Sequence, residues 1–357
     1  MHLKHLKTVN TLFKIQVLFL FFVIFSTYSQ KKYDIRTVAF YNLENLFDTI
    51  NDVSKKDELS PIMELKNERS KVYWDKIEKL SDVILQVGTE KTNTSPVILG
   101  VAEIENKAVL KDLINSEKLR KKRYDIIHFD SPDGRGIDVA LLYQSRYFKP
   151  IHYESFNPNI YSENTKINTR DILWVQGFLD NEEVNIIVNH WPSRRGGEIK
   201  SSPLREKAAY KVTQIIEQIR ENNTDAKIII MGDFNDDPTN TSLKKVLKTK
   251  ADKENLQKND IYNPYENMFK KGLNTLGYRD NINLFDQILV SKPFLNIEKQ
   301  DFSTYKLFKA AIFNKRFLTQ KKGRSKGYPF RSFSNGKYTG GYSDHYPVYM
   351  YLIKEKK

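Results

Sequence analysis

Residues 228–238 read IIIMGDFNDDP, and this stretch decides how the rest of the chain is interpreted. The apolar run Ile228–Met231 is typical of a strand that is buried on both faces, and it stops at Gly232. Three acids and an amide follow at once: Asp233, Asn235, Asp236 and Asp237. Gly, Asn, Asp and Pro all favour turns, so turn chemistry alone would account for them. The alternative is that the strand presents a carboxylate and an amide to a metal ion, a water or a phosphate.

Other predicted strands also begin or end in polar residues. These residues are Asn42 after VAFY, Glu103 after ILGVA, Asn189 and His190 after VNIIV, Asp286 before QILV, Asp138 before VALLY, and Asp344 and His345 before YPVYM. One polar strand end means little, but this many in one chain indicate a shared cause. If the ends converge, they form a cleft that contains several carboxylates, two amides and two histidines.

Such a cleft suits the hydrolysis of a phosphate ester. That reaction needs a Lewis acid for the phosphate charge, an activated water and a stabilised leaving oxygen. Mg²⁺ accepts one or two carboxylates and keeps several of its waters. Histidine transfers protons near neutral pH, and a carboxylate that fixes its tautomer makes it a better base.

The composition sets wider limits. The 357 residues suffice for one large domain or two modest ones, and the formal net charge of +14 favours anionic partners such as nucleic acid, phosphorylated small molecules or acidic membrane. A surface that is simply rich in lysine is the alternative. The absence of cysteine excludes a disulfide-stapled scaffold and thiolate metal sites. With only six histidines, any metal is expected to be hard and bound by oxygen.

The first 29 residues are typical of a secretory signal peptide. Three lysines and no acid precede the apolar run Ile15–Phe25, and small residues follow at Thr27 and Ser29. The apolar run is short for a membrane span, although an uncleaved anchor is the alternative. We therefore expect a signal peptide over 1–29, a single domain over 30–357, and a protein exported to the periplasm or the cell exterior.

Strands and helices alternate along the rest of the chain and predict an α+β layered fold. Apolar residues at helical spacing predict a helix over 73–87 that Gly88 ends, and a second helix that begins at Pro203 with Ser202 as its N-cap. The predicted strands YDIIHF and IDVALLY have no helix between them, which favours antiparallel pairing. Insertions are expected at 48–70, 252–283 and 301–340.

The motifs VAFYNLENLFD, VAEIEN, NHWPSRRGG, MGDFNDDP, FDQILV and SDHYPV resemble the successive signatures of the endonuclease/exonuclease/phosphatase superfamily, which has the deoxyribonuclease-I-like fold. They follow the order of that family and span residues 37–352. The resemblance implies a four-layer α/β sandwich, in which helices flank two packed mixed β-sheets and the active site lies at one rim.

The resemblance also implies roles for the metal and water ligands. Glu103 resembles the metal-binding glutamate, and Asn42 resembles the amide beside it. Asp344 is expected on the metal side or as a supporting carboxylate. Asp233 resembles the aspartate that orients or deprotonates the attacking water. Asn235 resembles the amide that holds that water or the phosphoryl oxygens.

The two histidines and two arginines complete the expected site. His345 resembles the histidine at the scissile phosphate, with Asp286 as the partner that orients it. His190 resembles the second catalytic histidine, with Asp138 as its candidate partner, although His190 could instead pack against Trp191 as a structural residue. Two arginines are candidates for phosphate binding, Arg194 and Arg195, and the alternative is that they are ordinary surface charges.

Residues 302–343 contain ten Lys or Arg, ten Phe or Tyr and no acid. Cations interleaved with aromatic rings suit nucleic acid, through phosphate neutralisation and base stacking. They would equally suit an anionic bilayer surface. The third reading is a solvated loop whose aromatic rings pack on the sandwich.

The resulting functional hypothesis is an exported phosphodiesterase that depends on Mg²⁺ or Mn²⁺, with Ca²⁺ as a further option. Its first-choice activity is endonuclease hydrolysis of nucleic acid. A phosphatase or a sphingomyelinase-type phospholipid phosphodiesterase is the alternative on the same fold. The non-enzyme alternative is an inactive member that binds nucleic acid or a surface. We expect a monomer without a stable protein partner.

Overall fold

The computed structural model describes residues 32–162, 164–278, 280–295 and 301–356. The expected signal peptide over 1–29 lies outside these residues. Ile35–Lys354 form one compact unit. Within the described ranges, none of the helices combines the length and apolar character that a membrane span needs.

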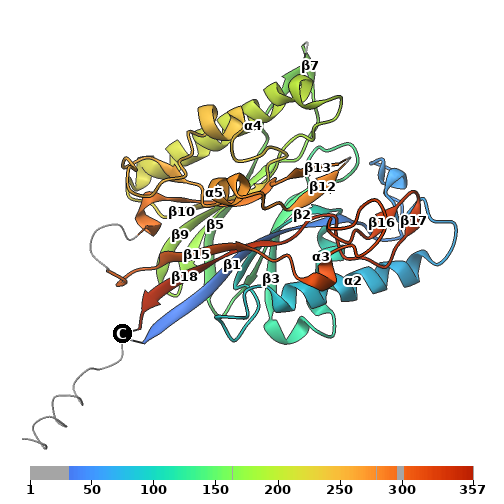
Figure 1. Ribbon diagram of the computed structural model, residues 1–357, viewed down its shortest axis with the longest axis horizontal. Coiled ribbons are helices and arrows are strands. Elements are labelled where there is room, and N and C mark those ends of the chain that lie inside the picture. Colours follow the sequence, from blue (N-terminus) through green and yellow to red (C-terminus); the bar gives the residue numbers. More distant parts are fainter. Residues whose placement is uncertain (1–31, 163, 279, 296–300, 357) are drawn as a thin grey trace, which may run out of the picture. The chain divides into compact units, whose positions relative to one another are not determined.

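Two six-stranded mixed sheets form the centre of the fold (Figure 1). The first sheet has the strand order β15 (Lys306–Ile312), β18 (Val348–Glu355), β1 (Tyr33–Leu46), β2 (Ile98–Ile104), β4 (Asp138–Gln144) and β3 (Tyr124–His128). The second sheet has the order β11 (Ile261–Tyr262), β14 (Asp286–Ser291), β10 (Ile228–Asp233), β9 (Glu182–His190), β8 (Ile172–Leu179) and β5 (Phe148–Phe156). The predicted strands YDIIHF and IDVALLY form β3 and β4, and their antiparallel pairing is confirmed.

Helices cover the outer faces of both sheets. α2 (Arg69–Gln86) and α3 (Lys107–Asn115) lie on the first sheet, and α4 (Glu198–Asn222) lies on the second (Figure 1). The short helix α5 spans Tyr265–Lys270, and three hairpins complete the fold: β6 (Tyr161–Ser162) with β7 (Thr165–Lys166), β12 (Leu276–Tyr278) with β13 (Asn281–Asn283), and β16 (Phe333–Ser334) with β17 (Lys337–Tyr338). The four-layer sandwich expected from the sequence is confirmed.

Strand β10 shows why its sequence is continuously apolar. Ile229 and Met231 point into the core between the two sheets, whereas Ile228 and Ile230 pack under α4. Successive side chains of a strand point to opposite faces, so a strand covered on both faces needs no polar residue. At Gly232 an added Cβ would lie 2.3 Å from the carbonyl oxygen of Asn189, so only glycine allows β9 to approach so closely there.

The ends of the two long helices test the predicted boundaries. Gly88 has a φ of +72° and follows the last residues of α2, which confirms the predicted helix stop. The predicted start of the second helix at Pro203 is wrong, because α4 already begins at Glu198 and contains the proline. Proline in the second turn removes one helical hydrogen bond, to the carbonyl of Ile199, which lies on an exposed turn.

The strands that the sequence prediction missed include β5 and β15, which lie at the edges of the two sheets. β5 is mostly exposed and contains Pro150, and it forms an edge where a missing N–H does no harm. β15 lies inside the range 301–340 that the sequence marked as an insertion, but it pairs with β18 and extends the first sheet. Exposed edge strands lack the alternation of apolar and polar residues that identifies a half-buried strand.

Candidate active site

Three site residues lie side by side on neighbouring strands of the second sheet. Asp233 at the end of β10 is paired in register with His190 at the end of β9 and with Asp286 at the start of β14. Directly paired residues point to the same face of a sheet. The strand register therefore places a histidine and two carboxylates in one row.

The neighbouring ends of β1 and β2 in the first sheet are irregular. The β1–β2 register shifts between Asn42 and Leu46, and the β2–β4 register shifts around Glu103. Glu103 has a φ of 59°, a left-handed conformation that is uncommon for residues other than glycine. Bulges of this kind redirect side chains and occur often near active sites. Here they turn Glu103 toward the row on the second sheet.

Asp233 is the centre on which the two sheets converge. Its Oδ2 accepts a hydrogen bond of 3.1 Å from Nδ2 of Asn42. The same oxygen lies 3.7 Å from Nε2 of His190 and 3.9 Å from Nε2 of His345. His190 Nε2 lies 3.9 Å from Oε1 of Glu103. Five of the residues expected from the sequence thus form one cluster.

His345 forms an ion pair with a buried carboxylate. Its Nδ1 lies 2.7 Å from Oδ2 of Asp286, as the sequence predicted for this pair. Burial opposes the charged form of His345, but the carboxylates of Asp286, Asp233 and Asp344 outweigh burial and raise its pKa well above the usual value. Asp344 is partly exposed, with Oδ1 at 3.9 Å from Nε2 of His345 and Oδ2 at 3.4 Å from a guanidinium nitrogen of Arg331.

The predicted pairing of Asp138 with His190 is not formed. Asp138 instead accepts hydrogen bonds from Ser131 and lies 2.9 Å from Nε2 of His128, which is ten residues earlier in the chain. Nδ1 of His190 is buried and has no hydrogen-bond partner among the described residues. Burial, followed by the positive charge of Arg170, lowers the pKa of His190 well below its usual value, so this histidine is neutral.

The turn after β10 divides its polar residues between site and scaffold. Asn235 has a φ of 50° and donates its backbone N–H to Oδ1 of Asp233 and its side-chain Nδ2 to the carbonyl of Trp191. Asp236 pairs with buried Arg205 at 2.6 Å, and Asp237 accepts the backbone N–H of Leu284. One carboxylate therefore belongs to the cluster, and the other two hold the turn that positions it.

Arg194 is bound to the protein itself rather than free for a phosphate. Its Nε donates to the carbonyl of Asn235 at 2.9 Å, and its Nη atoms contact the acids Glu198, Asp236 and Asp237. The guanidinium also lies 4.4 Å from the ring centre of Phe285. The phosphate role expected for Arg194 therefore does not fit this geometry. Arg195 is exposed.

Several charged residues near the site were not identified from the sequence. Glu44, which the sequence left unassigned, is buried and accepts the backbone N–H groups of Ser332 and Phe333, and it thereby ties β1 to the segment that leads to His345. Lys76 of α2 is buried and donates to Ser332 at 2.7 Å. Two more cations border the site: Arg135, whose charge contributes to the low pKa of His190, and Arg331.

The site residues fit a divalent cation. Glu103, His190 and Asp233 each offer one atom, and these atoms lie within 4.8 Å of one another. Burial raises the pKa of Asp233 to about 7, against the opposing charge of His345. Ionised carboxylates in such a place need a cation, and oxygen donors are those that Mg²⁺ and Mn²⁺ prefer. Asn42 holds Asp233 in place, because its Nδ2 donates to Oδ2 of Asp233. The backbone N–H of Glu44 donates to Oδ1 of Asn42 and fixes the orientation of this amide.

This charge arrangement predicts that the metal-free protein loses stability as pH rises from about 5 to 8. Burial raises the pKa values of Asp233, Glu44 and Glu105 to about 7, so in this range the folded state holds protons that the unfolded state has released. The raised pKa of His345 acts in the same direction, and the lowered pKa of His190 opposes it below about pH 6.5. Each group contributes a slope of about 1.4 kcal/mol per pH unit while it titrates.

Thermal unfolding in EDTA and in Mg²⁺ across this pH range checks the prediction. Mg²⁺ should raise Tm more at pH 8 than at pH 5, because the cation binds the ionised carboxylates of the folded state. The variant Glu103→Gln removes the carboxylate of the proposed metal site and should lose most of the Mg²⁺ effect on Tm. A Tm that does not change with pH, or an equal Mg²⁺ effect in the variant, would contradict the assignment.

Comparison with known proteins gives an independent view of the fold. Residues 37–354 match a family model described as the endonuclease/exonuclease/phosphatase family. A search among curated proteins finds no match.

Solved structures share the architecture at low sequence identity. An endonuclease/exonuclease/phosphatase family protein from Bacteroides thetaiotaomicron has a TM-score of 0.55 and 18% identity, covering 91% of this chain and 97% of that one. The mannosyl-6-phosphatase of the same organism has a TM-score of 0.53 and 19% identity, with coverages of 89% and 99%. TDP2 from D. rerio, in complex with a single-strand DNA product, has a TM-score of 0.52 and 14% identity, with coverages of 89% and 99%. The TM-scores show a common fold, and at such low identities they show the fold alone.

Proposed function

The chain belongs to the endonuclease/exonuclease/phosphatase family, and we propose on this premise that it is an exported, divalent-metal-dependent phosphodiesterase. The observation that carries the proposal is the cluster around Asp233. Two histidines and Asn42 converge on one buried carboxylate, and Glu103 faces it from the other sheet. Groups whose pKa values are pushed in opposite directions within a few ångströms are typical of acid–base catalysis.

The pKa directions assign a task to each group in the proposed reaction. Asp233 has a pKa of about 7, so at neutral pH it can both orient a water and accept its proton. His345 stays protonated beside Asp286 and is placed to stabilise charge on a phosphoryl oxygen or to protonate a leaving oxygen. Neutral His190 offers a hydrogen bond without adding charge.

Glu103 is the ligand that we assign to the divalent cation, because its carboxylate has no partner other than the backbone N–H of Asn45 and the more distant His190 among the described residues. When bound, Mg²⁺ or Mn²⁺ would neutralise negative charge on the phosphate and favour attack at phosphorus. Asn235 supports the arrangement, because its backbone N–H fixes Oδ1 of Asp233.

Nucleic acid is the first-choice substrate, on the basis of exposed cations in the segment that leads to the site. Lys321, Lys322 and Lys326 are exposed, and their side chains form no hydrogen bond or ion pair with the described residues. They precede Arg331, which contacts Asp344 of the site. Base stacking contributes less to this argument, because Phe313 and Phe333 are buried under the first sheet and Phe308 is the residue of the segment with a largely exposed ring. The packed-loop reading thus accounts for most of these rings.

Replacement of these three lysines tests the nucleic-acid assignment. The variant Lys321→Gln/Lys322→Gln/Lys326→Gln should weaken DNA cleavage, and the salt dependence of DNA binding should fall by about one slope unit for each phosphate that the lysines neutralise. Turnover of bis(p-nitrophenyl) phosphate should stay unchanged, because this small ester needs only the central cluster. Equal salt slopes for the variant and the natural protein would exclude a nucleic-acid contact at these residues.

A substrate panel tests the proposed reaction class. Supercoiled plasmid, p-nitrophenyl phosphate and sphingomyelin are each incubated with the protein in Mg²⁺ and in EDTA. Plasmid nicking that requires Mg²⁺ and is lost in His190→Ala would support the endonuclease. An intact plasmid with turnover of a monoester would favour a phosphatase, a reading supported by the shared fold with the mannosyl-6-phosphatase. No turnover of any substrate would overturn the enzyme assignment.

Export belongs to the same proposal and rests on the character of residues 1–29. Fractionation of the source cells and mapping of the protein's N-terminus test it. We expect a periplasmic or extracellular protein whose chain starts near residue 30. A cytoplasmic protein that retains Met1 would contradict export and leave the proposed chemistry untouched.

A further inference from the structure

A basic hollow lies at the end of the first sheet where β2 begins and β4 ends. It has a volume of about 690 Å³ and is formed by three chain segments. These are the residues before β2 (93–94), the residues before β3 (121–123) and the end of β4 with the residues after it (144–147). The hollow is therefore built by the rim of the sheet and not by one loop.

The lining of this hollow has positive charge without compensation. It contains four cations, Lys121, Lys122, Arg123 and Arg146, and no acid. None of these four side chains forms a hydrogen bond or ion pair with a residue that the structure describes. Arg194, by comparison, is paired with Glu198.

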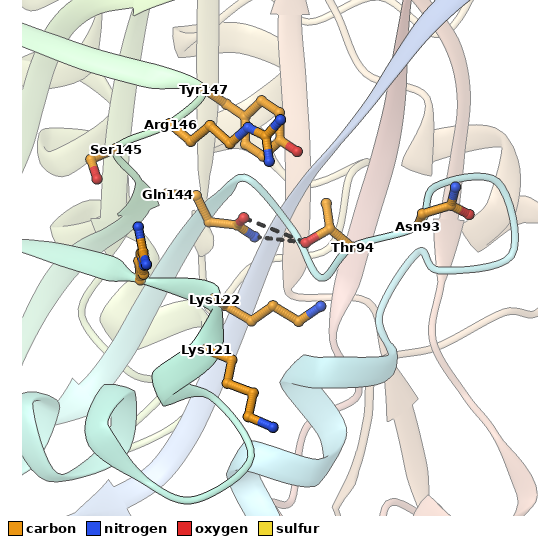
Figure 2. A pocket seen from close by; sticks show the side chains of 9 residues that line it. Asn93, Thr94, Lys121, Lys122, Gln144, Ser145, Arg146 and Tyr147 are labelled. Atoms are coloured by element: carbon orange, nitrogen blue, oxygen red, sulfur yellow. Dashed lines mark hydrogen bonds between the residues drawn. The ribbon is translucent and has the colours of Figure 1, made fainter.

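The frame that carries these cations is fixed by a buried glutamine. Nε2 of Gln144 donates to the carbonyls of Ser95 and Pro96, each at 3.1 Å, and its side chain also contacts Thr94. Figure 2 shows Lys121 and Lys122 on one side of the Gln144–Thr94 contact and Arg146 on the other. Only the flexible ends of the cationic side chains need to move to contact a ligand.

The hollow is separate from the candidate active site. Strand β2 starts at Ile98, next to the hollow, and reaches Glu103 near its other end. With about 3.3 Å per residue, Ile98 and Glu103 lie roughly 17 Å apart. A group bound in the hollow therefore cannot contact the cluster around Asp233.

We propose that this hollow is a second anion-binding site that takes a phosphate group. A guanidinium fork and ammonium groups bind phosphate oxygens well, and the hydroxyl groups of Thr94 and Ser145 add neutral donors. The phosphate has two sources of the same chemistry, a soluble phosphorylated molecule or the headgroup of an anionic phospholipid. This inference goes beyond the proposed hydrolysis and does not depend on it.

Binding measurements with the full chain in EDTA test the site without the use of activity. The probes are inorganic pyrophosphate in calorimetry, and vesicles of phosphatidylglycerol with neutral phosphatidylcholine vesicles as a reference. The test variant is Lys122→Glu/Arg146→Glu, and Lys122→Gln/Arg146→Gln replaces it if the charge reversal impairs folding. The matched control is Lys211→Glu/Lys245→Glu, which makes the same change in net charge on the elements that cover the second sheet.

The expected result is that the test variant binds at least about tenfold more weakly and the control variant binds like the natural protein. Such a loss with pyrophosphate identifies a soluble ligand. A loss seen only in the preference for phosphatidylglycerol over phosphatidylcholine identifies a lipid headgroup. No binding of either probe, or equal loss in test and control variants, would overturn the proposal.

Discussion

Asp233→Asn is expected to lower phosphodiester turnover by about 10³-fold, within the range of 10²–10⁴ that a positioned base contributes. Asp233 is buried at the end of β10, and burial raises its pKa to about 7. The asparagine keeps the size of the side chain but cannot accept a proton. Steady-state kinetics with bis(p-nitrophenyl) phosphate in saturating Mg²⁺ measure the effect as a fall in kcat.

Stability separates this loss from a folding defect. At pH 8 an ionised carboxylate at 233 is buried and destabilises the metal-free protein, so its removal offsets the weakened contact with Asn42. We expect the Tm of Asp233→Asn in EDTA at pH 8 to be no lower than that of the natural protein. Asp237→Asn serves as the matched control, because Asp237 lies in the same turn but binds the backbone of Leu284. A control with the same loss of kcat would show that the turn, and not the base, is required.

His345→Asn should cost about 10²–10⁴-fold in kcat, because the variant removes the protonated group nearest to Asp233. His345 is buried, with Nδ1 at 2.7 Å from Asp286 and Nε2 at 3.9 Å from Asp233. The ion pair with Asp286 keeps the histidine charged at neutral pH. The loss should be seen with diester and monoester substrates alike.

Asp286→Asn tests the same pair through the pH profile. Asp286 is the largest cause that raises the pKa of His345, so this pKa falls when the Asp286 charge is removed. The alkaline limb of the kcat profile should therefore move to lower pH, and activity should recover in part as the pH is lowered. A variant that loses activity equally at every pH would show a structural role for Asp286 and contradict the assigned pairing.

The fold was predictable because its strands carry clear signals at their ends. The apolar run before Gly232 and the polar residues after it identified β10 and Asp233. Both sheets are packed on two faces, so their central strands are strongly apolar. Strand register was not predictable from one sequence. The alignment of His190, Asp233 and Asp286 depends on pairing between segments about 40 to 50 residues apart, which the structure supplies.

Two site assignments do not fit the observed contacts, and both have the same physical cause. Asp138 was paired with His190 in the prediction, but the nearer His128 on the adjacent strand occupies its carboxylate. Arg194 was assigned to phosphate, but the acids of the turn after β10 bind its guanidinium. A sequence shows which charges exist, and only the folded chain shows which of them neutralise one another.

Buried cations were missed for a related reason. Lys76 and Arg205 lie on helices, where charged residues are normally assigned to the solvent-facing side. Both are buried because a partner lies beneath the helix. Ser332 accepts a hydrogen bond from Lys76, and Asp236 forms an ion pair with Arg205. Neither partner is close in sequence, so no local pattern could have indicated the contact.

A metal titration is the sharpest test of the metal-dependent site around Asp233. The protein is freed of metal and its turnover of bis(p-nitrophenyl) phosphate is followed as Mg²⁺ or Mn²⁺ is added, beside the variants Glu103→Gln and Asp237→Asn. We expect no turnover without metal, saturable activation of the natural protein and of Asp237→Asn, and loss of activation in Glu103→Gln. Full turnover in EDTA, or unchanged activation of Glu103→Gln, would contradict a metal-dependent phosphodiesterase centred on this cluster.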